Sequence, residues 1–150
     1  MEMMKKNIYV IMTAWLVMSV FVSCDIETSD NGKLDGYWHL DRVDTLSTGG
    51  RADLSNKYIF WAVQKDLLNI IDRRDGAGDF LFRFEHKGTT LRLYEPHVND
   101  RMNGDPAVED AGLLSPFGVN ALDETFKVDR LSGSKMELST DKLKLSFIKL

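Results

Sequence analysis

Hydrophobic and polar residues alternate with a period of two through most of the chain after residue 35. The clearest segment is residues 79–95, DFLFRFEHKGTTLRLYE, in which phenylalanine recurs at every second position from Phe80 to Phe84. This period is typical of a β-strand that buries one face. A turn at Gly88-Thr89, where glycine accepts the positive φ of a tight loop, sets Phe84 opposite Leu93. The segment is therefore predicted to form a β-hairpin.

The first strand is predicted at residues 36–46, GYWHLDRVDTL. Trp38 and Leu40 face inward, and a bulge at Asp41-Arg42 then shifts the phase by one residue before Val43. Residues 47–56 contain Gly49-Gly50 and no apolar spacing, so they are predicted to be a loop.

Residues 57–73 have two interpretations. As two strands with a turn at Lys65-Asp66, they pair Val63 with Leu68 and Trp61 with Ile70. As a helix, the same apolar residues form a stripe at helical spacing. The crowding of β-branched and aromatic residues at the start of the segment favours two strands.

The last third of the chain repeats the hairpin pattern. A three-residue loop at Ser132-Gly133-Ser134 sets Val128 opposite Leu138. A turn at Thr140-Asp141 then predicts that Leu138 pairs with Leu143 on the inner face and that Glu137 pairs with Lys144 on the outer face.

One long irregular stretch, residues 97–123, interrupts the strands. Asp105-Pro106 has the pattern of an N-cap followed by proline at the first helical position, which predicts a short helix over residues 106–113. Leu114 and Phe117 are too apolar for a solvated loop and are expected to cover one end of the core.

The sum of these elements is an all-β fold of about eight strands in hairpin order. Such a series closes most simply as an antiparallel up-and-down barrel with one short helix in a long loop, because closure removes exposed edges. An eight-stranded barrel is either filled by side chains or holds one small ligand. The many large rings favour a filled interior, and no cavity above about 300 Å³ is expected.

The N-terminal 23 residues have the pattern of a secretory signal: Lys5 and Lys6 precede an apolar run that is short for a membrane span. The run ends at Phe21-Val22-Ser23-Cys24, which resembles the lipobox of bacterial lipoproteins and implies that Cys24 is acylated. An uncleaved anchor, or an ordinary signal with an incidental cysteine, is the alternative. Residues 24–34 are predicted to be an acidic, flexible tether, and residues 35–150 the barrel domain.

Charge narrows the choice of partners. Without residues 1–23, which carry two lysines and one glutamate, the formal charge of −4 becomes about −5. Nucleic acid is not expected as a partner, because binding it requires a basic surface. The single cysteine, Cys24, excludes an internal disulfide.

Gly36-x-Trp38 resembles the Gly-x-Trp that opens the first strand of lipocalins, in which the tryptophan closes the base of the barrel. Together with Cys24, it makes the mature chain resemble the lipocalin-like small lipoproteins of Bacteroidetes. Lipocalins stack an arginine of the final strand on that tryptophan, and Lys149 is the candidate for this role here. The resemblance implies a lipid-anchored barrel at the outer membrane or cell surface.

No residue pattern in the chain predicts an enzyme, a metal site or a cofactor. There is no nucleophile with a base and no phosphate-binding glycine loop, and the three histidines lack partners at metal-site spacing. Asp72 and Glu95 fall on inward positions near barrel ends, where solvated carboxylates need no catalytic role.

Two functions follow from this fold. The first is an interaction or structural module that meets an envelope protein. The second is a module that binds a small apolar or amphipathic ligand at a barrel mouth formed by His86, Glu95, Leu114 and Phe117.

Overall fold

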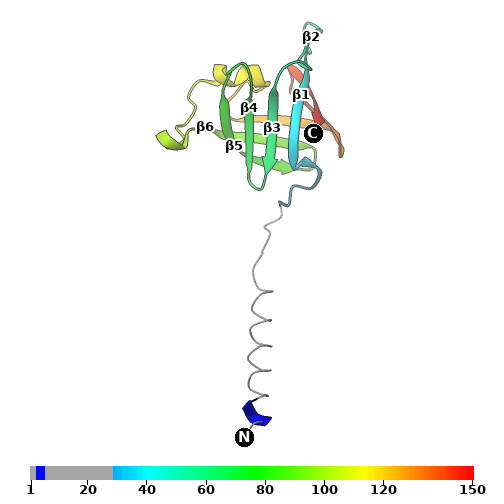
Figure 1. Cartoon of the computed structure of the whole chain (residues 1–150). Helices are drawn as coiled ribbons and strands as arrows, with labels where there is room; N and C mark the ends of the chain where they lie inside the picture. Colours follow the sequence, from blue (N-terminus) through cyan, green and yellow to red (C-terminus); the bar gives the residue numbers. More distant parts are fainter. Residues whose placement is uncertain (1–2, 6–28) are drawn as a thin grey trace.

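The computed structural model describes residues 3–5 and 29–150 (Figure 1). The predicted signal peptide, apart from residues 3–5, and the predicted acylation site Cys24 lie outside the described residues. In the described ranges, no helix is both long enough and apolar enough to cross a membrane.

The described chain forms nine antiparallel strands in one sheet. The strands are β1 (Gly36–Thr45), β2 (Gly50–Asp53), β3 (Ile59–Gln64), β4 (Leu67–Asp72), β5 (Asp79–Lys87), β6 (Thr90–Val98), β7 (Glu124–Leu131), β8 (Lys135–Ser139) and β9 (Leu143–Lys149). Pairing of β1 with β9 closes β1 and β3–β9 into the predicted eight-stranded barrel, and β2 extends one side of β1. The loop prediction for residues 47–56 is therefore wrong at β2. All four residues of β2 are exposed, so the strand leaves no apolar signal in the sequence.

Most of the predicted registers are confirmed. Phe84 lies opposite Leu93 in the β5–β6 hairpin, and Trp61 lies opposite Ile70 in β3–β4, which settles residues 57–73 as two strands. Val128 pairs with Leu138. The predicted bulge is also present, because the β1–β9 register shifts between Leu40 and Arg42.

The predicted register of the last hairpin is wrong by two residues. Leu138 lies opposite Leu145 rather than Leu143, because the β8–β9 connection is longer than a two-residue turn. A shift of two keeps every side chain on its predicted face. Glu137 and Lys144 consequently meet diagonally, with 3.1 Å between the carboxylate and the ammonium nitrogen.

The long loop contains 3₁₀-helices, and the short helix begins later than predicted. Residues 106–108 run extended beside β6, where Val98 N–H donates to Pro106 O and Val108 N–H donates to Pro96 O. The helix η4 (Ala111–Phe117) starts after Asp110, whose side chain accepts a hydrogen bond from the Gly112 N–H. Two shorter 3₁₀-helices are η2 (Gly32–Leu34) and η3 (Arg101–Asn103).

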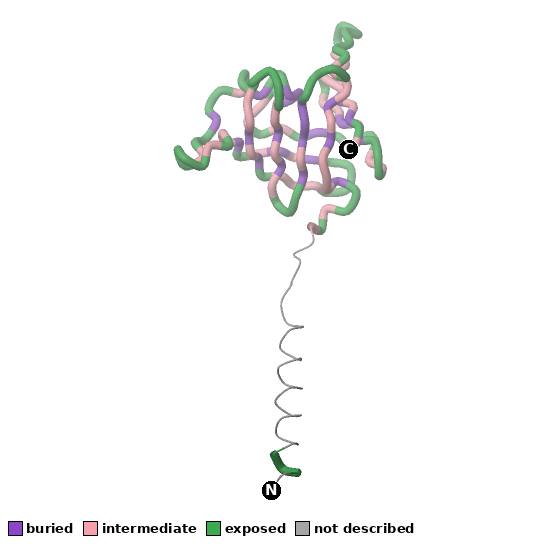
Figure 2. The backbone as a smooth tube through the Cα atoms, viewed as in Figure 1, coloured by how far each residue is buried: buried purple, intermediate pink, exposed green. Residues whose placement is uncertain are grey.

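Buried residues follow the strands, and exposed residues gather in the connections (Figure 2). The buried apolar side chains form one core cluster, which includes Leu34 and Val119 from outside the strands. Leu34 is 1% exposed, and Ser29 and Asn31 bond to the backbone of Lys65. Residues 29–34, which the sequence assigned to the flexible tether, are thus packed against the barrel.

Candidate functional site

Large aromatic side chains occupy the interior of the barrel. The ring of Trp61 lies with its centroid 4.9 Å from that of Phe147 and 5.8 Å from that of Phe126, both in edge-to-face geometry. All three residues are at most 2% exposed. Trp61 Nε1 donates a hydrogen bond to Phe117 O over 3.3 Å, so the polar atom of the indole is satisfied as well.

The end of the barrel that the N-terminal segment enters is closed by Trp38. Its Nε1 donates a hydrogen bond to Leu34 O over 2.8 Å, and its side chain is completely buried. The Lys149 ammonium nitrogen lies 5.0 Å from the centroid of the Trp38 ring. Lys149 therefore lies over Trp38, in the position expected for it from the sequence.

The opposite end of the barrel is closed by η4. Leu114 and Phe117 are completely buried, and the ring centroid of Phe117 lies 5.6 Å from that of Phe80 at the start of β5. The expectation that these residues cover one end of the core is confirmed. Leu114 and Phe117 do not line an open barrel mouth, because both side chains are in the core and neither has exposed surface for a ligand.

His86 and Glu95 do not join them. His86 pairs with Leu91 beside the β5–β6 turn, six residues along β5 from Phe80, which corresponds to about 20 Å of strand. Glu95 is exposed, because β6 carries one extra residue where the register shifts between Leu81 and Arg83. This bulge, at which Glu95 has a φ of 51°, turns the predicted inward side chain outward. The four predicted mouth residues therefore do not form one site.

A groove on the outer wall lies next to Glu95. Its volume is about 630 Å³, and it is lined by Arg92, Tyr94, Glu95, Pro96, His97, Ala107, Val108, Leu122 and Asp123. It forms where β7 separates from β6. The two strands pair only along residues 90–93 of β6, and beyond that point His97 of β6 forms a bridge with Ala107 of the long loop instead. We call this site the β6 groove.

The floor of the β6 groove is apolar, and its rim is charged. Pro96 and Val108 are buried. At one side, Arg92 donates to both oxygens of Asp123 over 2.8 and 2.5 Å, and its guanidinium carbon lies 4.8 Å from the Tyr94 ring centroid. The hydrogen bond from Arg92 lowers the pKa of the Asp123 carboxyl, and its positive charge adds to this effect.

The Glu95 carboxylate forms no ion pair with any described residue, whereas the Arg92 and Asp123 charges offset each other. The Glu95 carbonyl oxygen lies 2.8 Å from Nδ1 of His97. Such a rim can accept hydrogen bonds from a cationic or polar group above an apolar floor. The sequence pointed to Glu95 alone, since neither Ala107 nor Leu122 has a signal that links it to β6.

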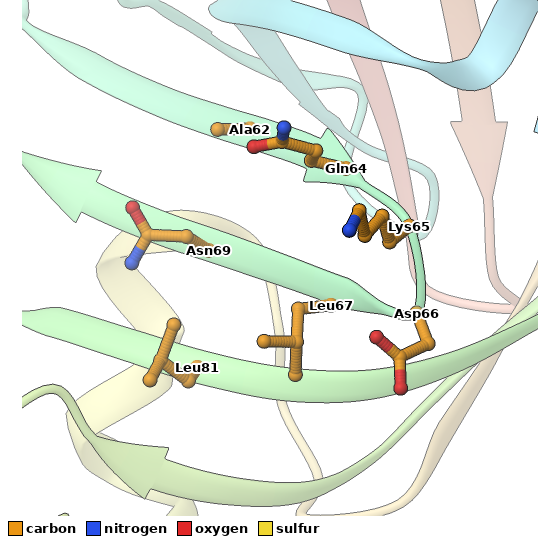
Figure 3. Close-up of a pocket in the computed structure, with 7 residues that line it drawn as sticks. All are labelled: Ala62, Gln64, Lys65, Asp66, Leu67, Asn69 and Leu81. Carbon is orange, nitrogen blue, oxygen red and sulfur yellow. The ribbon is translucent and has the colours of Figure 1, made fainter. Parts of the chain in front are cut away.

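A second pocket lies on the outer faces of β3, β4 and β5 (Figure 3). Its volume is about 490 Å³, and Ala62, Asn69 and Leu81 lie on three neighbouring strands. Asn69 Nδ2 donates to Asp79 Oδ1 over 2.5 Å and to Phe80 O over 3.0 Å, which fixes the amide. We call this site the β3–β5 pocket. The expected upper limit of about 300 Å³ is therefore wrong for the outer surface, where both pockets exceed it.

The described residues contain no group of three histidine, cysteine, aspartate or glutamate side chains that could hold a metal ion. Asp72 has a structural role. Burial by itself raises its pKa, but hydrogen bonds from the backbone N–H groups of Arg74, Asp75 and Ala77 outweigh burial and lower the pKa. The Asp72 carboxylate thus holds the loop between β4 and β5.

Comparison with known proteins agrees with this architecture. A lipocalin-like protein from Bacteroides uniformis ATCC 8492 is 24% identical, with a TM-score of 0.61 over 79% of this chain and 100% of that one. An uncharacterized protein from Bacteroides eggerthii DSM 20697 is 19% identical, with a TM-score of 0.56 over 77% of this chain and 98% of that one. No curated protein matches the chain.

Residues 17–150 match the family described as Lipocalin-like domain. The match spans every strand of the barrel, together with the η4 plug and the Trp38 closure. The chain therefore belongs to the lipocalin-like domain family.

Proposed function

We propose that this protein is a lipid-anchored interaction module of the bacterial envelope that meets a protein partner through the outer wall of its barrel. The observation that carries the proposal is the filled interior: Trp61, Phe126 and Phe147 pack ring against ring where a ligand-binding barrel has its cavity. A barrel without an internal site can act only through its surface. The β6 groove is the contact surface that we assign to the partner, and no enzymatic step is part of the proposal.

The anchor in this proposal is Cys24. Each acyl CH₂ buried in a bilayer contributes about 0.8 kcal/mol, so two or more chains hold a protein stably where one does not. The outer membrane or the cell surface is the proposed location. Replacement of Cys24 by alanine should release the protein from membranes, and a Cys24→Ala variant that stays in the membrane fraction would contradict acyl anchoring.

The partner contact can be tested by photo-crosslinking in intact cells. A crosslinking amino acid is placed in the β6 groove at Tyr94. The matched control position is Tyr58, which immediately precedes β3 and is 42% exposed. We expect a defined crosslinked product from position 94 that is absent from position 58. Ala107→Trp, which fills the groove, should abolish that product. Identical products from both positions would refute the assignment of the groove.

A second function is supported by the size of the groove. About 630 Å³ falls within the range of roughly 300 to 1,000 Å³ that is typical of small-molecule sites. The alternative is thus a small apolar or amphipathic ligand on the outer wall, instead of one in the barrel mouth. Native mass spectrometry that finds a retained small molecule in the native chain, and none in Ala107→Trp, would favour this alternative over a protein partner.

A further inference from the structure

The two ends of the barrel differ in what they carry. The tether end consists of residues 29–35, the turns at 65–66 and 88–89, the loop 132–134 and the C-terminus. The far end carries η4 and the loops at 46–49, 73–78 and 140–142. The described chain enters the barrel at one end, and η4 lies at the other (Figure 1).

The chain is fixed to the tether end from Ser29 onward. The Lys65 N–H donates to Ser29 Oγ over 2.7 Å, and Asn31 Nδ2 donates to Lys65 O over 2.6 Å. Ser29 Oγ also donates to Asp35 Oδ1 over 2.5 Å. These bonds, with the buried Leu34, attach residues 29–34 to the β3–β4 turn and leave only residues 25–28 between this attachment and Cys24.

Covalent geometry then limits how the barrel can stand on a membrane. Four residues lie between Cys24 and Ser29, so the two Cα atoms are five steps apart, and a fully extended chain of that length spans at most about 18 Å. A strand of nine residues such as β5 is about 30 Å long, and its tilt of about 40° from the barrel axis makes the barrel about 23 Å high. If the far end touched the headgroups, Ser29 would lie at about that height above the membrane. Residues 25–28 are too few to span that distance from Cys24. The far end is therefore excluded from contact with the membrane that holds Cys24.

Charge distinguishes the remaining orientations. Counted with the two described residues that flank each of its segments on either side, the tether end carries six basic and three acidic side chains: Lys33, Lys65, Lys87, Arg130, Lys135 and Lys149 against Asp30, Asp35 and Asp66. Counted in the same way, the far-end loops together with residues 99–124 carry eleven acidic and six basic side chains. Anionic headgroups attract the first set and repel the second within about one Debye length, roughly 10 Å at 0.1 M salt.

We infer that the barrel stands upright on the bilayer, with the tether end against anionic lipid headgroups and η4 pointing away. This inference rests on the proposed acylation of Cys24. It gives the two outer sites different surroundings. The β3–β5 pocket, lined by Lys65 and Asp66, lies beside the headgroups, whereas the β6 groove, lined by Ala107 and Leu122, stays open to a partner.

The orientation can be measured with two matched serine-to-cysteine variants of the acylated protein. Ser134→Cys places a thiol at the tether end and Ser115→Cys places one on η4; both serines are exposed, and acylated Cys24 carries no free thiol. Each variant is labelled with the same fluorophore and bound to phosphatidylcholine vesicles with about one phosphatidylglycerol in five and a headgroup nitroxide as quencher. We expect quenching at position 134 to exceed quenching at position 115 by about threefold or more at low salt.

Each outcome of this experiment has one meaning. If the protein fails to sediment with vesicles, acyl anchoring and the orientation both fail. If it sediments but the two positions are quenched equally, or position 115 more strongly, the orientation alone is overturned. The double variant Arg130→Glu, Lys135→Glu should lower the quenching ratio in anionic vesicles and leave it unchanged in neutral ones. An unchanged ratio in both would refute the part played by charge.

Discussion

Lys149 is the cross-strand partner of Trp38, and its side chain passes over Gly36 and places the ammonium nitrogen 5.0 Å from the centroid of the Trp38 ring. A Cβ atom on residue 36 would come within 2.4 Å of Lys149 Cε, and Gly36 has a φ of 129°. The glycine of the Gly36-x-Trp38 motif is therefore required by both its backbone conformation and the lysine that crosses it. The lysine also donates a hydrogen bond to Lys33 O over 3.2 Å, so it joins the last strand to the segment before the first.

Replacement of Lys149 by methionine should destabilise the barrel by about 0.5 to 2 kcal/mol, because the cation over the Trp38 ring is lost while the apolar stem is kept. Lys149→Arg, which retains a cation that stacks well on aromatic rings, should be much closer to the native chain. Equilibrium urea unfolding measures both. Equal stability of the methionine variant and the native chain would show that the cation contributes nothing.

Gly118 and Gly104 provide a matched pair for separating backbone strain from collision. Each follows a 3₁₀-helix in the left-handed region, at φ 85° and 78°. A Cβ at residue 118 would lie 2.7 Å from Leu145 Cδ2 in the core, whereas nothing lies within 4 Å of one at residue 104. Gly104→Ala should cost about 1 to 2 kcal/mol of unfolding free energy from strain. Gly118→Ala should cost clearly more, and equal losses in thermal unfolding would refute the collision.

Trp61→Ala should lower the free energy of unfolding by about 3 to 5 kcal/mol, because it empties the centre of the core. The rings of Phe126 and Phe147 lose their partner, and the carbonyl of Phe117 loses its donor. Leu113→Ala, at a residue 49% exposed on η4, is the control and should change stability by no more than about 0.5 kcal/mol. Comparable losses in the two variants would contradict a packed interior.

The Asp72 carboxyl should make stability depend on pH in acid. Its folded pKa lies below the ordinary value of 3.8, so the native state favours the ionised form more than the unfolded chain does. Its contribution is therefore complete above pH 3.8 and is lost as the pH falls through the lower, folded pKa.

Asp72→Asn should accordingly reduce stability by about 1 kcal/mol at neutral pH, since weaker acceptors then face three backbone N–H groups. The difference from the native chain should shrink in strong acid. Asp75→Asn, which removes an exposed pair with Lys57, is the control and should show a smaller change. A gap between Asp72→Asn and the native chain that stays constant across the acid range would contradict the assignment.

Much of the architecture could be predicted from the sequence, because alternation over several hairpins fixes both the face and the register of a strand. The two-residue error at Leu138 and Leu145 marks the limit of this reasoning: faces are conserved by an even shift, so hydrophobicity cannot choose between the two registers. The helix over residues 106–113 was wrong for another reason. The Pro106 carbonyl accepts a hydrogen bond from the Val98 N–H of β6, and this tertiary contact outweighs the local capping pattern.

The candidate site could not be predicted in the same way. The extra residue of β6 breaks the period at Glu95, so the alternating pattern placed an outward carboxylate inside the barrel. The β6 groove also requires residues 107–108 and 122–123 to meet β6, and these segments belong to a loop without periodicity. Leu114 and Phe117 were correctly expected at one end of the core. That end proved to be a plug, where the sequence had suggested a mouth.

The most direct test of the account is titration with an anilinonaphthalene dye, which fluoresces on entering an apolar cavity. It is carried out in an Ala107→Trp background so that the β6 groove is blocked. We predict no saturable binding of the dye to this protein. Trp61→Ala should leave a cavity on the order of 150 Å³, which is too small for the dye but accepts benzene, so benzene should raise the melting temperature of that variant and not that of this protein. Saturable binding without Trp61→Ala, abolished by Leu114→Trp, would mean that the barrel is hollow and would contradict the central claim.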